Sequence, residues 1–206
     1  MAIELHSWPR SAGTRVSWAL EELGVPYQYV EVDAEKGENH SARHLTVHPL
    51  GKVPALVDGD RSFFESAAIL IHLGNTYGVS RHLWPEAGGQ AEADALSWTV
   101  CGTVEIFSHM MQYLYHGLDT PMSYDQKDRS QAVADFALSQ FNRCLDALEA
   151  RLDKREHLLG NFTLADIACV SGLLFGTRFG VSLSAYPRVA AWANRCGARP
   201  ALQRAR

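Results

Sequence analysis

The stretch Gly51-Lys52-Val53-Pro54-Ala55-Leu56-Val57-Asp58-Gly59 decides the fold of this chain. Proline inside a sheet removes a backbone donor, so Pro54 is expected at the first position of a strand over 55–57 or at a sheet edge. Asp58-Gly59 is a strong signal for a tight turn between two apolar runs, which predicts a hairpin whose second strand covers 62–64.

The residues on either side of this hairpin indicate a small-molecule site built largely from backbone. A cis Val53-Pro54 bond would leave the Val53 N–H and C=O free to pair with an extended ligand, although a frequency of about 5–6% for cis X-Pro bonds favours trans. Glu65 and Ser66 precede an apolar helical run and therefore lie at a helix N-terminus, where the helix dipole favours a bound carboxylate. An ordinary N-cap is the alternative for these two residues, and the preceding loop favours the binding site.

Strands and helices alternate before residue 78. In chain order we expect a strand over 3–5, a helix over 14–23 that stops at Gly24, a strand over 27–32, a helical turn over 41–45, the hairpin over 55–64 and a helix over 66–77. This order is typical of an α/β layer arrangement.

The remainder of the chain is predicted to be helical. Residues 79–89 are rich in glycine, proline and polar residues and are expected to form a linker. Helices are expected over 91–116, 126–152, 164–175 and 188–196. Thr163 followed by Asp166 predicts a variant of the capping box, which we interpret as a folding motif.

Composition excludes several classes of protein. A net charge of −4 without a basic run argues against nucleic acid or an anionic membrane as the main partner. The chain has neither an apolar run long enough to span a bilayer nor a signal-peptide core at its start, so a cytoplasmic protein is expected. The cysteines, which lack C-x-x-C spacing, are expected to be reduced and packed: Cys101, Cys144, Cys169 and Cys196.

Four segments in this order make the chain similar to cytosolic glutathione S-transferases, and specifically to a serine-type, bacterial-looking member. They are WALEELGVPY at 18–27, PLGKVPAL at 49–56, ESAAI at 65–69 and GNFTLADIA at 160–168. The resemblance implies an α/β thioredoxin-like glutathione-binding domain over 1–78, a linker over 79–89 and an all-α helical domain over 90–206. It also implies a cytoplasmic homodimer and a role in detoxification.

The resemblance places the catalytic hydroxyl in the loop before the first helix. In the family, a Tyr, Ser or Cys there donates a hydrogen bond that holds the glutathione sulfur as thiolate, which lowers a thiol pKa from about 8.5. Here Ser11 is the expected donor. Ser7, near the end of the first strand, and Thr14, the expected helix N-cap, are competing hydroxyls, and a loop hydroxyl that caps the helix is the alternative role for Ser11.

The resemblance also implies the contacts to glutathione. Lys52 would pair with the glycyl carboxylate, to which His40 would also reach, and Val53 would bind the cysteinyl backbone. A solvated lysine and a surface histidine are the alternatives for Lys52 and His40. Glu65 and Ser66 would hold the γ-glutamyl ammonium and carboxylate. No metal is expected. His48 stands where many relatives have asparagine, which leaves the hydrogen bonding of this loop open.

The implied activity is conjugation of the glutathione thiolate to a small hydrophobic electrophile, with peroxide reduction or glutathione-assisted isomerisation as variants. Aromatic and methionine side chains would supply an adaptable apolar wall, although helix core is the default for each: Trp8, Phe107, Met110, Met111, Tyr113 and Tyr115. A non-catalytic binding or interaction protein of the same fold is the alternative function. A disulfide oxidoreductase is disfavoured because no cysteine precedes Cys101.

Overall fold

The computed structural model describes residues 3–205, which divide into two compact units. Unit 1 consists of Met1–Glu92 and Arg199–Arg206, and unit 2 of Ala93–Ala198. Residues 79–89, the predicted linker, are grouped with unit 1. Across residues 3–205, no helix combines the length and the apolar character needed to cross a membrane.

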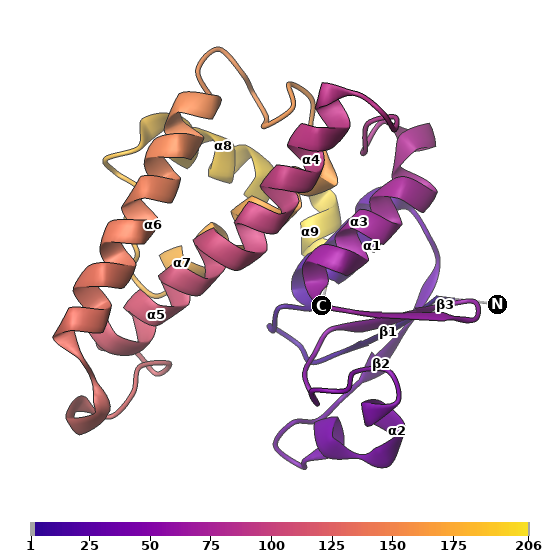
Figure 1. Ribbon diagram of the computed structural model, residues 1–206, viewed down its shortest axis with the longest axis horizontal. Coiled ribbons are helices and arrows are strands. Elements are labelled where there is room, and N and C mark those ends of the chain that lie inside the picture. The colour runs from indigo at the N-terminus through magenta and orange to yellow at the C-terminus, as the bar shows by residue number, and fades with distance from the viewer. Residues whose placement is uncertain (1–2, 206) are drawn as a thin grey trace. The chain divides into compact units, whose positions relative to one another are not determined.

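A four-stranded mixed sheet forms the centre of unit 1. Its strands are β1 (Ile3–Ser7), β2 (Tyr27–Glu31), β3 (Ala55–Asp58) and β4 (Arg61–Phe64), in the order β2-β1-β3-β4. β1 is parallel to β2 and antiparallel to β3, and β3 is antiparallel to β4. Helices α1 (Thr14–Leu23) and α3 (Ser66–Leu73) cover one face, and α2 (Ala42–Leu45) lies on the other (Figure 1). The predicted thioredoxin-like α/β arrangement is therefore confirmed.

The apolar positions of this sheet and its helices form the core of unit 1. Leu5, Leu20, Leu56 and Ile69 are fully buried. Short helical turns complete the unit at Glu38–His40 and Val79–Arg81, and a π-helical turn over Gly74–Gly78 extends α3. Burial of this apolar surface is the main driving force for folding of the unit.

The sequence predicted the C-terminal end of α1 correctly but not its N-cap. Gly24 adopts the left-handed conformation (φ 60°) and ends the helix as predicted. The N-cap is Gly13 rather than Thr14, so the expectation for Thr14 is wrong. Thr14 is the first helical residue, and in the described part of the chain its buried Oγ1 atom has no hydrogen-bond partner.

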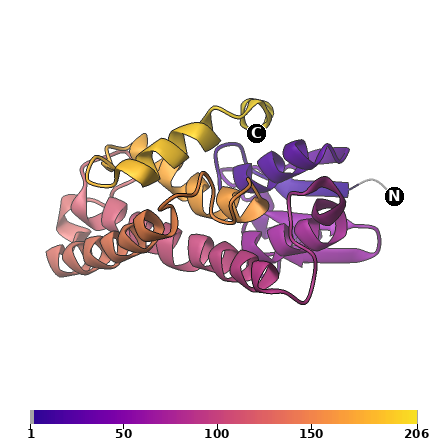
Figure 2. The ribbon, with the colours of Figure 1, turned by 90° about the horizontal axis from the view of Figure 1, so that it is seen from above.

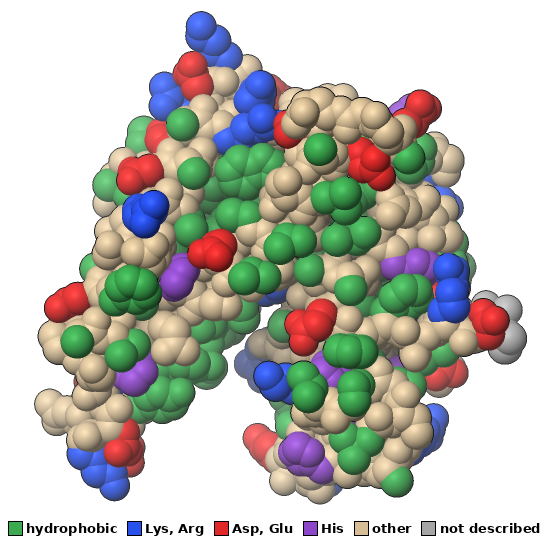
Figure 3. All heavy atoms as spheres, viewed as in Figure 1, with side chains coloured by type: hydrophobic (Ala, Val, Ile, Leu, Met, Phe, Trp, Pro, Cys, Tyr) green, Lys and Arg blue, Asp and Glu red, His purple; other side chains and the backbone are tan. Residues whose placement is uncertain are grey.

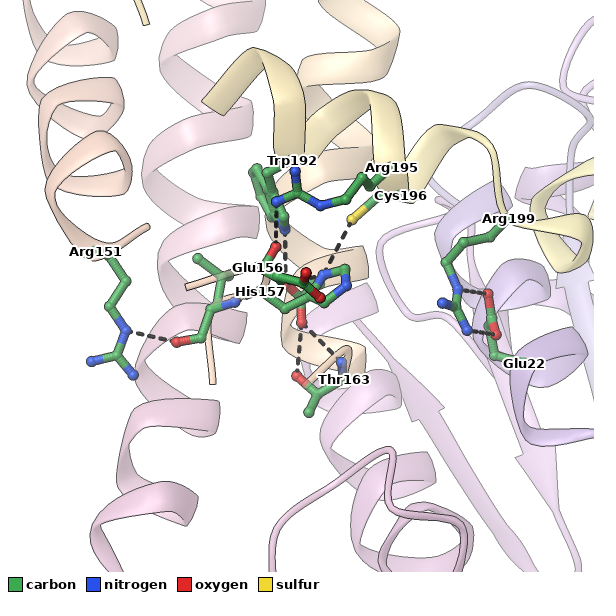
Figure 4. Close-up of polar contacts among 11 residues, drawn as sticks. Glu22, Arg151, Glu156, His157, Thr163, Trp192, Arg195, Cys196 and Arg199 are labelled. Atoms are coloured by element: carbon green, nitrogen blue, oxygen red, sulfur yellow. Dashed lines mark hydrogen bonds and ion pairs between the residues drawn. The ribbon is translucent and has the colours of Figure 1, made fainter. Parts of the chain in front are cut away.

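A carboxy-terminal helix, α9 (Pro200–Arg204), packs on α1 and was not predicted from the sequence. The Arg199 guanidinium binds both carboxylate oxygens of Glu22 at 2.6 and 2.7 Å (Figure 4). Arg204 pairs with Glu21 at 2.8 Å. These ion pairs hold the end of the chain against the amino-terminal domain.

Unit 2 is helical, as predicted. In it, α5 (Phe107–Gly117) packs on α6 (Gln131–Arg151) and on α7 (Leu164–Thr177) (Figure 2). A π-helical segment over Gly102–Ile106 joins α4 (Gln90–Cys101) to α5. A Cβ atom on Gly102 would lie 2.6 Å from the carbonyl carbon of Ala168 in α7, so glycine allows this close approach. The unit also contains a short helical turn over Gln126–Asp128 and the helix α8 (Pro187–Gly197).

A buried carboxylate ties the hairpin of unit 1 to α3. One oxygen of Asp58 accepts hydrogen bonds from His72 Nε2 at 2.7 Å and from the Tyr77 hydroxyl at 2.8 Å. Burial alone raises the pKa of Asp58, but the hydrogen bonds from His72 and Tyr77 outweigh it, so the pKa is lowered. A carboxyl whose pKa is lower in the folded state stabilises the fold above its unfolded pKa of about 3.9, and this stability is lost as the pH falls through the folded pKa.

Replacing Asp58 with asparagine is therefore expected to lower the free energy of unfolding at pH 7 by about 1–3 kcal/mol. Urea unfolding at a series of pH values down to about 3 should show the difference from wild type shrinking as the acid form of Asp58 becomes populated. Asp60→Asn, in the exposed turn of the same hairpin, is the matched control and should change little. If the free energy of unfolding had the same pH dependence in Asp58→Asn and in wild type, the Asp58 carboxylate would not be a stabilising group.

Candidate functional site

Three segments that carry predicted site residues leave the sheet at the same edge. His6 of β1 lies opposite Ala55 of β3, and Ala55 lies opposite Phe64 of β4. The loop after β1, the Val53-Pro54 dipeptide before β3 and the Glu65-Ser66 pair after β4 therefore meet there. The sheet register brings together the segments that sequence reasoning selected separately.

The three competing hydroxyls lie in different environments, with Ser7 at the end of β1, Ser11 in the following loop and Thr14 at the start of α1. The Ser11 hydroxyl oxygen accepts a hydrogen bond from the Gly13 N–H at 3.1 Å and lies 3.4 Å from the Ser7 hydroxyl oxygen. Ser7 is fully buried, whereas Ser11 is partly exposed. Because the Thr14 oxygen is also buried, Ser11 is the best placed of the three to meet a ligand.

The Val53-Pro54 peptide bond is cis, so the expectation of a trans bond is wrong. Pro54 lies one residue before β3, which begins at Ala55, rather than at the first position of the strand. Side chains from the α2 region hold the adjoining loop: Asn39 Nδ2 donates to the Gly51 carbonyl at 2.7 Å, and His44 Nε2 lies 2.8 Å from the Lys52 carbonyl oxygen.

Two further histidines lie at this loop. A Cβ atom on Gly51, whose φ is 60°, would lie 2.7 Å from His40 Nδ1, so the structure brings His40 against the loop. The His48 carbonyl accepts the Gly51 N–H at 2.9 Å, and its buried ring lies between His44 and Phe64. Burial lowers the pKa of His48, which favours the neutral imidazole.

A buried arginine of α1, which sequence reasoning missed, reaches the N-terminus of α3. Arg15, 3% exposed, donates from Nη1 to the Ser66 hydroxyl oxygen at 3.3 Å. Ser66 is the first residue of α3, and Glu65 occupies the N-cap position without a side-chain capping hydrogen bond. Arg15 lies on the buried face of α1, and a charged residue within an apolar helical pattern was the available signal.

Two residues at this edge hold an unusual backbone conformation. Arg10 (φ 60°) and Glu65 (φ 68°) lie in the left-handed region that favours glycine. Such strain concentrates at functional sites because the surrounding structure must maintain it. The arrangement of a helix N-terminus, a buried guanidinium, a cis-proline loop and a partly exposed hydroxyl suits an extended, anionic, peptide-like ligand.

The side chains predicted to form an apolar wall are divided by the structure. Met110 and Met111 are buried, and Met110 packs on α7, where a Cβ atom on Gly176 would lie 2.7 Å from its sulfur. These two methionines therefore belong to the helix core. Phe107, Tyr113 and Tyr115 of α5 and Trp8 of the first loop are partly exposed.

One group among residues 3–205 has the composition of a metal site, in unit 2. Ligand atoms of His157, Asp166 and Cys196 lie within 4.8 Å of one another. Both Asp166 oxygens already accept hydrogen bonds from protein donors, including Thr163 and Trp192 (Figure 4). We therefore interpret the group as a folding network.

Comparison with known proteins matches both parts of the chain to family models. The model described as "Glutathione S-transferase, N-terminal domain" matches residues 1–75, and "Glutathione S-transferase, C-terminal domain" matches residues 105–200. Glutathione S-transferase 4 of Zea mays is 32% identical, covering 97% of this chain and 90% of the relative. Glutathione S-transferase 1 of Zea mays is 35% identical, covering 93% and 89%. A solved glutathione transferase from Phanerochaete chrysosporium with oxidized glutathione has a TM-score of 0.86 at 26% identity, covering 98% of this chain and 92% of that chain.

Proposed function

This chain belongs to the glutathione S-transferase family, and on that premise we propose that it binds glutathione at the sheet edge of unit 1 and transfers alkyl or aryl groups to its thiolate. The observation that carries the proposal is the pairing of His6 in β1 with Ala55 in β3 and of Ala55 with Phe64 in β4. This register brings the three segments of the site together at one edge of the sheet. Glutathione is an extended, anionic peptide with a nucleophilic thiol, and the edge offers complementary groups for each of these properties.

In the proposed mechanism, Ser11 donates a hydrogen bond to the glutathione sulfur. Stabilising the charged form lowers the pKa of the thiol, so more thiolate is present at neutral pH. The bound thiolate then attacks a soft, hydrophobic electrophile, and the leaving group departs with its electron pair. The partial exposure of Ser11 and the burial of the Ser7 and Thr14 hydroxyl oxygens support this serine-type assignment.

The remaining proposed contacts hold the tripeptide. The Val53 backbone pairs with the cysteinyl residue, and Lys52 and His40 face the glycyl carboxylate. Glu65 and Ser66 bind the γ-glutamyl ammonium and carboxylate at the positive end of α3. Arg15 supports this role because its buried guanidinium hydrogen-bonds to the Ser66 hydroxyl.

Conjugation is the main activity, and peroxide reduction or glutathione-assisted isomerisation at the same site belongs to the proposal as a variant. The alternative is a binding protein that retains glutathione without turnover. The relatives reported above come from a plant and a fungus, so they support the family, and the bacterial-looking character of the chain stays a hypothesis.

A cytoplasmic homodimer completes the proposal, with the first domain of one subunit paired with the second domain of its partner. Exposed apolar side chains supply suitable surface on each unit, and Figure 3 shows hydrophobic side chains gathered on the face it displays. The exposed apolar side chains of the described residues include Leu45, Leu50 and Phe64 in unit 1 and Val100, Val104 and Phe136 in unit 2. Sedimentation velocity tests the assembly, because a homodimer has twice the 22.8 kDa mass of one chain.

Calorimetric titration of glutathione into the purified protein, followed by a chromogenic aryl halide in the same sample, tests the function. Binding with turnover would support the transferase. Binding without turnover would favour the ligand-holding alternative. Absence of binding would mean that the segments at the sheet edge mark the fold alone.

Replacing Ser66 with alanine is expected to weaken glutathione binding by about tenfold, because the γ-glutamyl carboxylate loses a charge-assisted hydrogen bond. Calorimetry measures the change in Kd. Ser62→Ala, an exposed serine on the neighbouring strand β4, is the matched control and should leave Kd unchanged. Equal affinities for Ser66→Ala and wild type would remove Ser66 from the site.

A further inference from the structure

The Ser7 hydroxyl, at the end of β1, is next to the first loop, and the proposed mechanism does not use it. Ser7 ends β1 and is 0% exposed, so it has no direct access to a ligand. Its Oγ atom lies 3.4 Å from two oxygens, the Ser11 hydroxyl and the Trp8 carbonyl. A fully buried hydroxyl next to a partly exposed one is suited to act through its neighbour.

The hydrogen-bonding capacity of the Ser11 hydroxyl gives Ser7 a role. A serine oxygen has one proton to donate and two lone pairs to accept with. One lone pair of Ser11 takes the Gly13 N–H at 3.1 Å. If the Ser7 hydroxyl donates to the second lone pair of Ser11, the Ser11 proton has no acceptor inside this cluster and points toward the ligand. If Ser7 instead donates to the Trp8 carbonyl, its own oxygen accepts the Ser11 proton and withdraws it from the ligand.

Gly13 provides the space in which this cluster forms. A Cβ atom at residue 13 would lie 1.7 Å from Ser7 Oγ and 3.3 Å from Ser11 Oγ. The backbone of Gly13 (φ −69°, ψ −22°) is one that any residue adopts, so its conformation alone does not require glycine. The Ser7 hydroxyl accounts for the absence of a side chain at this position.

We propose that Ser7 is a positioning residue, whose hydroxyl rotates to donate to Ser11 when a thiolate binds and thereby directs the Ser11 proton to the sulfur. This inference rests on the proposed function, in which Ser11 is the thiolate donor. Neighbouring hydrogen bonds polarise one another, so a Ser11 oxygen that accepts two of them is a stronger donor to the thiolate. No proton leaves Ser7, because both hydroxyls only reorient.

The test measures the pKa of the bound glutathione thiol from the ultraviolet absorbance of the thiolate as a function of pH. Ser7→Ala is expected to raise this pKa by about 0.5–1 unit, which corresponds to the loss of one hydrogen bond. Ser11→Ala is expected to raise it further, and Ser7→Ala/Ser11→Ala should match Ser11→Ala alone because Ser7 acts through Ser11. At about pH 5.5, where glutathione binds as the thiol, the Kd of Ser7→Ala should stay within about twofold of wild type.

Two further variants separate positioning from folding. Gly13→Ala should raise the thiol pKa at least as much as Ser7→Ala, since its Cβ displaces the Ser7 hydroxyl. Ser17→Ala is the matched control, because Ser17 is also fully buried but its hydroxyl donates to the Thr14 carbonyl on α1. It should leave the thiol pKa unchanged.

The outcomes distinguish this inference from the proposed function. A wild-type thiol pKa near 8.5 or no effect of Ser11→Ala would overturn the serine-type mechanism and Ser7's role with it. If Ser11→Ala raises the pKa of the bound thiol as expected and Ser7→Ala leaves it unchanged, the positioning role of Ser7 alone would be overturned. A larger effect from Ser7→Ala than from Ser11→Ala would make Ser7 the donor and overturn both assignments.

Discussion

Ser11→Ala is expected to lower the conjugation of glutathione to an aryl halide by about 100-fold at about pH 6, at saturating glutathione. The proposed hydrogen bond from Ser11 lowers the pKa of the bound thiol by about two units. At a pH below the thiol pKa of both wild type and variant, its loss therefore reduces the thiolate fraction by about 100-fold. Steady-state kcat/KM for the aryl halide measures the effect. The gap to wild type should narrow above about pH 9, where the variant also ionises its bound thiol.

The affinity for glutathione provides the control for this substitution. At about pH 5.5 both proteins bind the thiol form, so Kd should agree within about twofold. Thr14→Val is the matched variant: its buried hydroxyl oxygen has no partner in the described part of the chain, so its loss should leave kcat/KM within about twofold. A pH-independent loss in Ser11→Ala would contradict the thiolate role, and a wild type already without turnover would favour the non-catalytic alternative.

The parts of the site that could be predicted from the sequence are those with local signals. A proline before an apolar run and a polar pair before a helical run each reveal themselves within a few residues, which is why the Val53-Pro54 and Glu65-Ser66 segments were recognised. Their convergence depends on the sheet register, in which the neighbouring strands β1, β3 and β4 place these segments at one edge. Sequence order alone gave no means of measuring that proximity.

The features that the sequence did not reveal depend on contacts between distant residues. Arg15 and Ser66 are 51 positions apart, and Glu22 and Arg199 are 177 positions apart. Helical periodicity places Arg15 on α1 but does not identify its partner, so the buried arginine was missed. α9 has too few residues for a periodic pattern, and its docking on α1 depends on the long-range Arg199–Glu22 ion pair.

Thr163 and Asp166 show the opposite case, in which a local pattern predicted a feature of the buried core. The capping box is present, and the Thr163 N–H donates to the Asp166 carboxylate at 2.8 Å. The sequence did not reveal that the same carboxylate also accepts the Leu158 N–H at 3.0 Å and Trp192 Nε1–H at 2.8 Å. The fully buried Asp166 side chain therefore joins the start of α7 to the preceding loop and to α8.

Asp166→Ala is expected to lower the free energy of unfolding by about 3–5 kcal/mol. The substitution leaves the N–H groups of Leu158, Thr163 and Trp192 buried without their acceptor, and each such group costs about 1–3 kcal/mol. A loss of this size is a large fraction of the 5–15 kcal/mol typical of a domain, so the soluble yield should also fall. Urea unfolding followed by far-ultraviolet circular dichroism measures the change.

Three companion variants make the stability prediction decisive even if Asp166→Ala does not fold. Asp166→Asn keeps one acceptor oxygen and should lose less stability than alanine, whereas Thr163→Ala should cost about 1–2 kcal/mol as the loss of a helix cap. Asp135→Ala, an exposed aspartate on α6, should change stability by less than about 0.5 kcal/mol. If Asp166→Ala instead lay within 1 kcal/mol of wild type, the buried donors would have to find other partners, and the carboxylate would not be the group that fixes the start of α7.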